Sequence, residues 1–346
     1  MNPKKLDIPY NGVNPEKIKT ANPKIDLELL KRYAYYQKER TLIFYKKEIL
    51  KEDAPWSQNP MFQNFKFTMT KRWLDRESRN LIDNILNRPD ITYDNKLLNC
   101  IVFRLINKFK AFDELPEKYI DFDKFSDEYI NSLKQILIDK NLSGFFTSAY
   151  FISGTLRSLR LLEFKSDKNI PKGESNVYES FAVICRYVYN NRETFLKIKE
   201  MQTPNEMIKS LGGIYGLGQF LSYQIYSDWS YIEEFPFSDK EACDIGPGTE
   251  RGLKHLFVDF DGLNLQEAVF WIKDNIQKIC EENELEWDLE SWFSFLEPQQ
   301  RYWGCGDICN SFCEFDKTTR IWTEELQKEN GKRVRKFKTE RKLEEW

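Results

Sequence analysis

The sequence predicts an all-α fold, and three observations carry this prediction. Apolar residues return at spacings of three and four over most of the 346 residues, as they do on one face of an α-helix. Sustained alternation of apolar and polar residues, which is typical of a half-buried strand, is hard to find. Glycine, proline and asparagine separate the periodic runs and indicate short connections.

The elements can be placed in chain order. Residues 1–24 contain four prolines with many asparagines and lysines, a composition that opposes a regular helix and predicts an extended N-terminal arm. A long amphipathic helix follows from about residue 26 to residue 53, and Pro55 ends it. The same periodicity predicts further helices over residues 70–87, 95–109, 124–139, 143–153, 175–189, 204–211, 217–228, 264–281 and 299–314.

The domain organisation follows from these elements. Residues 25–328 are expected to form one helical unit, and the polar segment 165–175 predicts a surface loop at which this unit could divide into two lobes. Residues 329–346 form a basic C-terminal tail, with seven lysines and arginines and one glutamate between Gly331 and Lys342. Such a run is either a solvated tail or an arm that contacts a phosphate backbone.

The composition narrows the class of protein. Hydrophobic residues make up 41% and charged residues 31%, and the net charge is −3, which describes a folded soluble chain without a bulk attraction for polyanions. Long apolar stretches and the apolar core of a signal peptide are missing, so we expect a cytoplasmic protein. Seven cysteines in such a chain predict reduced thiols. The single histidine excludes a His-rich metal site and leaves acid–base chemistry mostly to carboxylates, lysines and tyrosines.

Three classes of motif can be set aside. The chain has no Gly-x-x-x-x-Gly-Lys-Ser/Thr, so a P-loop kinase or ATPase is not expected. The glycines around Gly248 lack the spacing and the preceding strand of a dinucleotide-binding loop. Cys305, Cys309 and Cys313 would share one face of a helix, but a fourth metal ligand is missing, and we expect ordinary thiols.

Two glycine-containing turns are candidates for binding phosphate. At Gly216 and Gly218 an apolar residue, Gly-x-Gly and an amphipathic helix follow one another, the pattern of a helix-hairpin-helix whose backbone N–H groups face a phosphate. At Gly246-Pro247-Gly248 a rigid turn precedes a helix with Arg251 in its first turn, which favours an anion pocket. Ordinary turns between packed helices are the alternative for both.

Charged residues on the helix predicted over residues 70–87 are further candidates. Arg72, Asp75, Arg76 and Arg79 would lie on one face of it, close to aromatic residues. This face is either solvated or able to grip phosphates and stack on bases.

Two later helices also carry candidate charges. Arg104 and Asn107 lie on an otherwise apolar helix, where Arg104 either pairs with a buried carboxylate or points into a cleft; we favour the cleft. Glu314 and Lys317, at i and i+3, form either a surface ion pair or an acid and a lysine delivered into the cleft.

These segments, taken in order, resemble those of one family. The matching runs are Ala54–Pro60, Phe67–Thr68, Arg72–Arg76, Phe103–Asn107, Gly216–Phe220 with Tyr223, Gln224 and Asp228, Gly246–Gly248 with Arg251–Leu253, and Cys313–Lys317. Over residues 26–325 the chain is similar to the α-glutamyl/putrescinyl thymine pyrophosphorylase family, whose members are also described as amino acid:DNA transferases. A related unit is the helical domain of 5-hydroxymethyluracil DNA kinases.

The resemblance implies a fold like that of helix-hairpin-helix DNA glycosylases, in a protein encoded mostly by bacteriophages that hypermodify thymine. In that pathway a kinase pyrophosphorylates 5-hydroxymethyluracil in DNA, and the transferase displaces the pyrophosphate with an amine from an amino acid or a polyamine. The implied partners are the modified DNA, the amine donor and a 5-hydroxymethyluracil DNA kinase, with no membrane. No cofactor is required, Mg²⁺ is a possible addition, and the compartment would be the host cytoplasm.

The same resemblance, with the residue chemistry, suggests roles for the candidate residues. We expect the target nucleotide to be flipped out of the duplex or met in a single strand. Pyrophosphate would be bound by Arg72, Arg76, Arg104, Gly246, Gly248 and Arg251. The catalytic candidates are Asp228, Glu314 and Lys317, with one carboxylate as the base for the amine and the lysine holding a donor carboxylate. Asn107, Tyr223, Gln224 and Asp75 would contact the base or substrate, Gly216 and Gly218 would contact the DNA backbone, and no metal ligand is assigned.

Two other functions use the same features. A DNA glycosylase acting on a modified pyrimidine would have the same fold, with an acid and a lysine beyond the hairpin glycines, where Asp239 and Lys240 stand. A non-catalytic DNA-binding module that assists a 5-hydroxymethyluracil DNA kinase would bind duplex DNA in a salt-sensitive manner without changing its bases.

Overall fold

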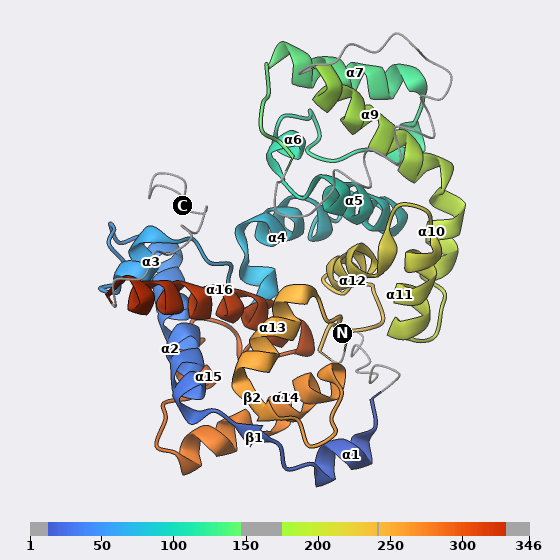
Figure 1. Ribbon diagram of the computed structural model, residues 1–346. Coiled ribbons are helices and arrows are strands. Elements are labelled where there is room, and N and C mark those ends of the chain that lie inside the picture. The colour runs from blue at the N-terminus through green and yellow to red at the C-terminus, as the bar shows by residue number, and fades with distance from the viewer. Residues whose placement is uncertain (1–12, 147–174, 241, 330–346) are drawn as a thin grey trace. The chain divides into compact units, whose positions relative to one another are not determined.

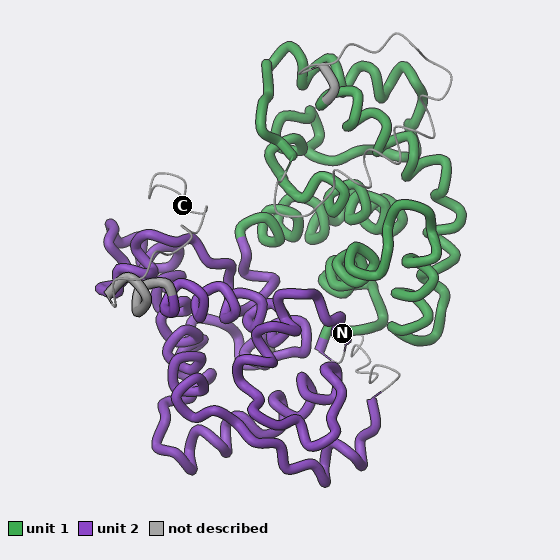
Figure 2. Tube along the Cα trace, in the orientation of Figure 1, with its two compact units in different colours: residues 1–8, 76–239 green, residues 9–75, 240–346 purple. Residues whose placement is uncertain are grey.

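The structure, a computed structural model, describes residues 13–146, 175–240 and 242–329 of the chain. Within these ranges almost every regular element is a helix, as the periodicity predicts (Figure 1). The chain forms two compact units (Figure 2). Unit 1 comprises residues 1–8 and 76–239, and unit 2 comprises residues 9–75 and 240–346.

Unit 1 is a cluster of helices. Its described elements are α4 (Arg76–Leu81) with the π-helical turn Ile82–Leu86, α5 (Tyr93–Ile106), α6 (Lys110–Asp113), the 3₁₀ turn Phe122–Lys124, α7 (Asp127–Asp139), α9 (Ser175–Asn190), α10 (Arg192–Ile198), α11 (Pro204–Gly213) and α12 (Gly218–Trp229).

Helix α5 forms the centre of unit 1. Every residue from Asn95 to Ile106 is buried, because α9, α10 and α12 pack around this helix. Thr92 begins α5, since its side-chain oxygen accepts the backbone N–H of Asn95. Asn107 ends the helix in the left-handed conformation at a φ of 50°, a conformation that asparagine tolerates better than most residues.

Unit 2 combines an early and a late part of the chain. Its described elements are α1 (Pro15–Thr20), β1 (Lys24–Ile25), α2 (Leu27–Phe44) with the π-helical turn Tyr45–Ile49, α3 (Pro60–Asn64), the 3₁₀ turn Arg72–Leu74, α13 (Pro247–Leu256), β2 (Phe257–Asp259), α14 (Leu265–Glu282), α15 (Leu289–Trp292), the 3₁₀ turn Pro298–Gln300 and α16 (Cys305–Glu329). The two strands pair antiparallel and join the two parts of the chain.

The core of unit 2 lies between α2 and α16. Tyr33 of α2 is fully buried and stacks on Phe312 of α16 with 4.5 Å between ring centres. Its ring also meets the edge of Phe315 at 5.1 Å, and its hydroxyl lies 2.6 Å from the Ser311 hydroxyl. The buried polar atom of this aromatic core is therefore hydrogen-bonded.

Helices α13 and α16 approach closely because two glycines of α13 face α16. A Cβ atom on Gly248 would lie 2.3 Å from Sγ of Cys313, and one on Gly252 would lie 2.1 Å from the carbonyl oxygen of Phe312. A side chain at either position would clash, so the close packing requires glycine there. This packing fixes the polar residues of α13 against those of α16.

The structure corrects the prediction for the N-terminal arm. Residues 15–20 form a helix rather than an extended segment. Pro15 occupies the first helical position, where a missing N–H costs nothing, and the side chain of Asn14 accepts the N–H groups of Glu16 and Lys17. Residues 1–12 and the tail 330–346 lie outside the described residues.

The helix predicted over residues 70–87 is also wrong, because it is interrupted. Asp75 is extended, at φ −62° and ψ 142°, between the turn Arg72–Leu74 and α4. Aspartate competes for backbone hydrogen bonds and favours helix boundaries, which explains the break. Arg72 and Arg76 therefore do not share a helical face.

Two further predictions concern segments that lie only partly within the described residues. Of the helix predicted over 143–153, residues 143–146 are not helical and the rest lies outside the description. The segment predicted as a lobe boundary, 165–175, lies almost wholly outside it as well. The flanking helices α7 and α9 pack against each other inside unit 1, and the chain passes between units at residues 75–76 and 239–240. No helix of the described part has the length and apolarity that a bilayer crossing requires.

Candidate functional site

The predicted site residues divide between the two units. Unit 1 holds Arg76, Arg104, Asn107, Gly216, Gly218, Tyr223, Gln224 and Asp228, whereas unit 2 holds Arg72, Asp75, Gly246, Gly248, Arg251, Glu314 and Lys317.

Glu314 and Lys317 lie on a mostly buried face of α16, beside the segment that precedes the Arg72 turn. The side chains are 14% and 20% exposed, and Lys317 Nζ lies 3.4 Å from Glu314 Oε2. The backbone N–H of Thr68 donates to the same carboxylate oxygen at 3.3 Å. Lys317 also donates to the carbonyl of Lys66, and its ammonium lies 4.7 Å from the ring centre of Phe67. The structure therefore brings the predicted acid and lysine together, in a fixed and partly solvated position.

Arg40 and Tyr36 of α2 complete the surroundings of Glu314, and the sequence predictions missed both. Arg40 Nε donates to the carbonyl of Phe67 at 3.0 Å. Burial lowers the pKa of Arg40, while Tyr36, Asp75 and Glu314 act in the opposite direction.

Tyr36 is fully buried, and burial together with the Glu314 carboxylate raises the pKa of its hydroxyl well above the usual range. Among the described residues no group hydrogen-bonds this hydroxyl. A signal for Arg40 was present in the sequence, because Tyr33, Tyr36 and Arg40 share the apolar face of one predicted helix.

Arg251 faces α16 from the second turn of α13. Its Nε donates at 3.0 Å to Asp316, whose side chain is 1% exposed, while the arginine side chain is 52% exposed. His255 and Arg320 contact the same carboxylate. The sequence predictions included Arg251 and missed the three other residues.

The turn before α13 has the predicted form. Gly246 caps the helix and Pro247 occupies its first position. Gly248, one residue further, packs directly on Cys313, so its lack of a side chain serves helix packing. A role of Gly246 and Gly248 in anion binding stays a prediction.

Arg72 and Asp75 lie at the edge of unit 2, and Arg76 begins unit 1. Arg72 is buried, and its backbone N–H donates to Asp307 of α16 at 2.8 Å. Arg76 is exposed and pairs with its neighbour Glu77 at 2.8 Å. Burial makes Arg72 a poor surface contact for DNA, whereas Arg76 is accessible.

Arg104 and Asp228 form a buried ion pair in unit 1. Two guanidinium nitrogens of Arg104 contact the two oxygens of Asp228, and the side chains are 4% and 0% exposed. Arg104 Nη1 also donates to Oδ1 of Asn107 at 2.8 Å. The expectation that Arg104 points into a cleft is wrong, because a guanidinium pairs inside the fold when a carboxylate is in reach. This position also argues against Asp228 as the base, since a buried carboxylate with both oxygens engaged cannot receive a proton from an incoming amine.

The predicted hairpin in unit 1 is present as two packed helices, α11 and α12. The turn between them uses two glycines in the left-handed region, Gly216 at a φ of 93° and Gly218 at 63°. Tyr215 and Phe220 are exposed at this turn. Tyr223 and Gln224, on the following turns of α12, are buried, which makes direct contact with a base less favourable than predicted.

The two residues predicted for a glycosylase, Asp239 and Lys240, lie in different units. Asp239 is buried in unit 1. The ammonium of Lys240 lies 4.3 Å from the ring centre of Tyr302 in unit 2. Cys305, Cys309 and Cys313 lie on α16, as the prediction of a shared helix requires, and no disulfide joins any of the seven cysteines. Within the described residues, no cluster of three or more His, Cys, Asp or Glu is suited to hold a metal ion.

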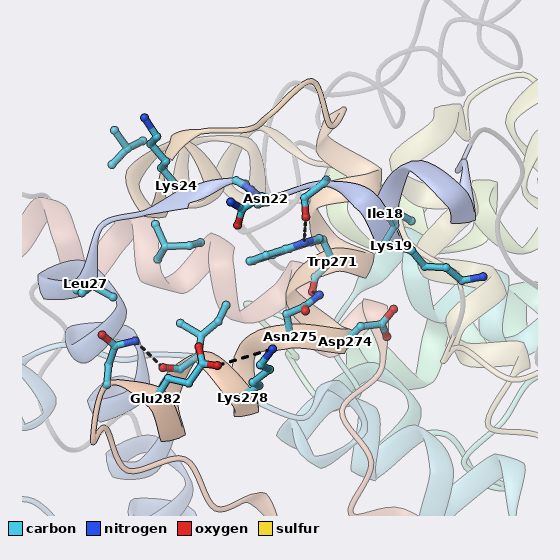
Figure 3. Close-up of a pocket in the computed structure, with 16 residues that line it drawn as sticks. Ile18, Lys19, Asn22, Lys24, Leu27, Trp271, Asp274, Asn275, Lys278 and Glu282 are labelled. Atoms are coloured by element: carbon cyan, nitrogen blue, oxygen red, sulfur yellow. Dashed lines mark hydrogen bonds and ion pairs between the residues drawn. The ribbon is translucent and has the colours of Figure 1, made fainter.

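A groove in unit 2 lies between α1, β1 and α14 (Figure 3). The indole N–H of Trp271 donates across it to the carbonyl of Ala21 at 3.2 Å. Charged side chains line the groove: Lys19, Lys24, Asp274, Lys278 and Glu282. None of the residues predicted for the functional site contributes to this groove.

Comparison with known proteins shows the family. The model of the family described as "5-hmdU DNA kinase, helical domain" matches residues 27–328. The chain belongs to this helical-domain family. A 5-hmdU DNA kinase of Bacillus phage SP10 is 24% identical over 283 residues, which cover 78% of this chain and 42% of the phage protein. The chain thus spans less than half the length of this relative. No solved structure matches the chain.

Membership of the helical-domain family confirms the broader part of the resemblance found in the sequence. The unit related to the transferases, the kinase helical domain, is the one that matches. The narrower transferase family and the glycosylase-like fold stay predictions, since neither comparison reaches them.

Proposed function

We propose that the protein acts in thymine hypermodification of DNA as a transferase. It would displace pyrophosphate from 5-(pyrophosphoryloxymethyl)uracil in DNA with an amine from an amino acid or a polyamine. A 5-hydroxymethyluracil DNA kinase would supply the modified DNA. This proposal rests on the helical-domain family and on the chemistry of unit 2.

The family membership supports a step other than phosphate transfer from ATP. The relative is named a kinase, but this chain contains no Gly-x-x-x-x-Gly-Lys-Ser/Thr. A loop of this kind is one common cradle for the phosphates of ATP. We therefore assign to the helical domain the handling of the modified base rather than the ATP chemistry.

One observation in unit 2 carries the transferase proposal. Helix α16 presents the partly exposed carboxylate of Glu314 and, two residues later, the buried carboxylate of Asp316 that binds Arg251. A base for an amine thus lies on α16, and a cationic group for a departing anion, Arg251 of α13, is bound within the same turn of α16. Displacement of pyrophosphate by an amine requires both.

The proposed step conserves atoms and charge. The amine nitrogen forms a bond to the exocyclic carbon of the base, and the bond from this carbon to the pyrophosphate oxygen breaks. Pyrophosphate leaves with the bonding electron pair, and Glu314 takes the proton that the amine loses. Lys317, which already contacts Glu314, provides positive charge for the carboxylate of an amino acid donor.

Asn107 is our candidate for reading the base. A guanidinium only donates, so the Asn107 oxygen faces Arg104 and the amide N–H₂ group faces away. Among the described residues, no group accepts from this N–H₂. Its donors suit a carbonyl oxygen, such as O4 of uracil, better than the amino group of cytosine.

The test is mass spectrometry of nucleosides. The protein is incubated with duplex DNA that contains 5-(pyrophosphoryloxymethyl)uracil, in a mixture of amino acids and polyamines. The proposal predicts a new amine-substituted thymidine, whose mass names the donor. Free base with an abasic site would instead indicate a glycosylase, and unchanged nucleosides with salt-sensitive DNA binding would indicate a binding module.

A further inference from the structure

Asp316 holds three basic side chains on the surface formed by α13 and α16. Its Oδ2 lies 3.0 Å from Arg251 Nε and 3.1 Å from Arg320 Nη2, and its Oδ1 lies 3.2 Å from His255 Nε2. Gly248 and Gly252 allow the two helices to approach until these side chains meet. We call Arg251, His255, Asp316 and Arg320 the Asp316 cluster.

Burial is distributed unevenly in the Asp316 cluster. The Asp316 side chain is 1% exposed, whereas Arg251 is 52%, Arg320 45% and His255 35% exposed. A pair that only fastened two helices would have its partners buried together. Here the anion is inside and the two guanidiniums, with the imidazole of His255, face solvent, so the surface that a ligand meets is positive.

Arg251 also keeps donors available. Only its Nε bonds Asp316, and among the described residues no group accepts from Nη1 or Nη2. The bond to Nε fixes the plane of the guanidinium, and the two terminal nitrogens then present N–H groups as a fork. Such a fork matches two oxygens of a phosphoryl group.

We propose that the Asp316 cluster is a binding site for a phosphoryl oxyanion, with Arg251 and Arg320 as contacts and Asp316 as their positioning residue. His255 donates to the remaining oxygen of Asp316 and so holds the carboxylate toward the two arginines. In the frame of the proposed function, the ligand is the pyrophosphate that leaves the base. A phosphate of the DNA backbone has the same chemistry and is the second source.

The test uses inorganic pyrophosphate and the full chain in isothermal titration calorimetry. Arg251→Ala and Arg320→Ala should each weaken pyrophosphate binding on the order of tenfold or more, because each removes a charge-assisted contact. Arg251→Lys should also weaken it, because lysine keeps the charge and loses the fork. Lys254→Ala is the matched control: it removes one charge from the same helix, at a side chain that is 58% exposed and pairs with Glu250. It should change the affinity less than twofold.

Asp316→Asn separates positioning from bulk charge. This variant makes the surface more positive by one unit, so attraction by net charge alone predicts tighter binding of pyrophosphate. Positioning predicts weaker binding, since the arginines lose their anchor. Thermal unfolding of each variant shows whether the fold is retained. If Asp316→Asn unfolds, Arg251→Lys still tests the site, because it leaves the buried carboxylate in place.

A second arm identifies the source of the anion. If the ligand is a backbone phosphate, Arg251→Ala weakens binding of unmodified duplex DNA and lowers the salt slope by about one, and pyrophosphate binding is unchanged. Unchanged affinity for both ligands in Arg251→Ala and Arg320→Ala overturns the site. Binding losses in a protein that transfers no amine would leave the site standing and reject the proposed function. If Arg251→Ala and Arg320→Ala instead transfer the amine at the normal rate and keep their affinities, the site is rejected and the proposed function stands.

Discussion

Arg104 on α5 and Asp228 on α12 form an ion pair in the interior of unit 1, although they lie 124 positions apart in the sequence. The pair joins the central helix of the unit to the second helix of the hairpin. It also orients Asn107 at the end of α5. Both residues belong to the motifs that resemble the transferase family, and their geometry gives them a structural task.

Removing one partner of this pair should destabilise the protein strongly. Asp228→Ala leaves a buried guanidinium without its carboxylate, which costs about 3–5 kcal/mol in the free energy of unfolding. Chemical denaturation measures this change. Removal of Lys140, whose side chain is 57% exposed and pairs with Glu114 at 3.0 Å, is the control and should cost less than about 1 kcal/mol.

The double variant Arg104→Met with Asp228→Leu tests the same pair by replacing both charged residues with apolar ones. It should be more stable than Asp228→Ala, because neither charge is then left unpaired. If Asp228→Asn instead abolished turnover at unchanged stability, Asp228 would be a catalytic residue and the structural assignment would be wrong.

The contact of α13 with α16 makes a prediction about two glycines. Gly252→Ala should destabilise unit 2 by about 1–3 kcal/mol, because the new methyl group meets the Phe312 carbonyl and the backbone must move. Gly248→Ala should also destabilise, and Cys313→Ala should restore part of the loss by removing the clashing sulfur. Gly213→Ala is the control, since no atom lies within 4 Å of the added methyl group. Equal melting temperatures for Gly252→Ala and Gly213→Ala would contradict the packing described.

Cys313 offers a prediction about pH. It is the one exposed cysteine among the seven, yet its sulfur lies against Gly248. Burial of the thiol, followed by the nearby carboxylates of Glu314 and Asp316, raises the pKa of Cys313 to about 11. The thiol is therefore protonated at neutral pH. Alkylation by iodoacetamide, followed by mass spectrometry, should accelerate about tenfold per pH unit between pH 8 and 10.

Substitution of Asp316 provides the check on this assignment. Asp316→Asn removes one carboxylate beside the thiol and should speed alkylation of Cys313 at pH 8. A rate that is already maximal at pH 8 would show that the thiolate is stabilised, and the described surroundings of the sulfur would be wrong.

Asn107 should determine the preference between pyrimidines. Asn107→Asp replaces the outward N–H₂ donors by an acceptor and should remove a preference for 5-hydroxymethyluracil over 5-hydroxymethylcytosine in DNA. The loss is expected to be on the order of tenfold or more, the usual scale for a base-edge contact. Equilibrium binding to two oligonucleotides that differ only in this base measures it. An unchanged ratio of affinities would exclude Asn107 as the reader.

Long helices could be predicted from the sequence because their cores are periodic. Helices α7, α9 and α14 lie within a few residues of the expected ranges, since each has one continuous apolar face. Helix α12 also matches its expected range, although its residues 221–229 are buried on every side. The break at Asp75 escaped prediction because a single aspartate marks it inside an otherwise helical pattern. The pair β1 and β2 escaped as well, since strands of two and three residues carry no alternation.

The candidate site could be predicted only where one segment holds all its members. Glu314 and Lys317 lie one turn apart, so their proximity follows from helical spacing. In the Asp316 cluster, Asp316 meets Arg251 and His255 from 65 and 61 positions away, and Asp228 meets Arg104 from another helix. Such pairings depend on tertiary packing, which local spacing does not encode. The sequence therefore predicted Arg251 without its anchor.

The most direct test of the account counts two products of one reaction. DNA containing 5-(pyrophosphoryloxymethyl)uracil is incubated with the protein and a single amine donor, and substituted thymidine and free pyrophosphate are measured together. We expect equal amounts of both products with the natural protein and with Lys254→Ala. With Glu314→Gln the rate should fall about a hundredfold, as expected for loss of a general base. Pyrophosphate release without a substituted nucleoside, or full activity of Glu314→Gln, would contradict it.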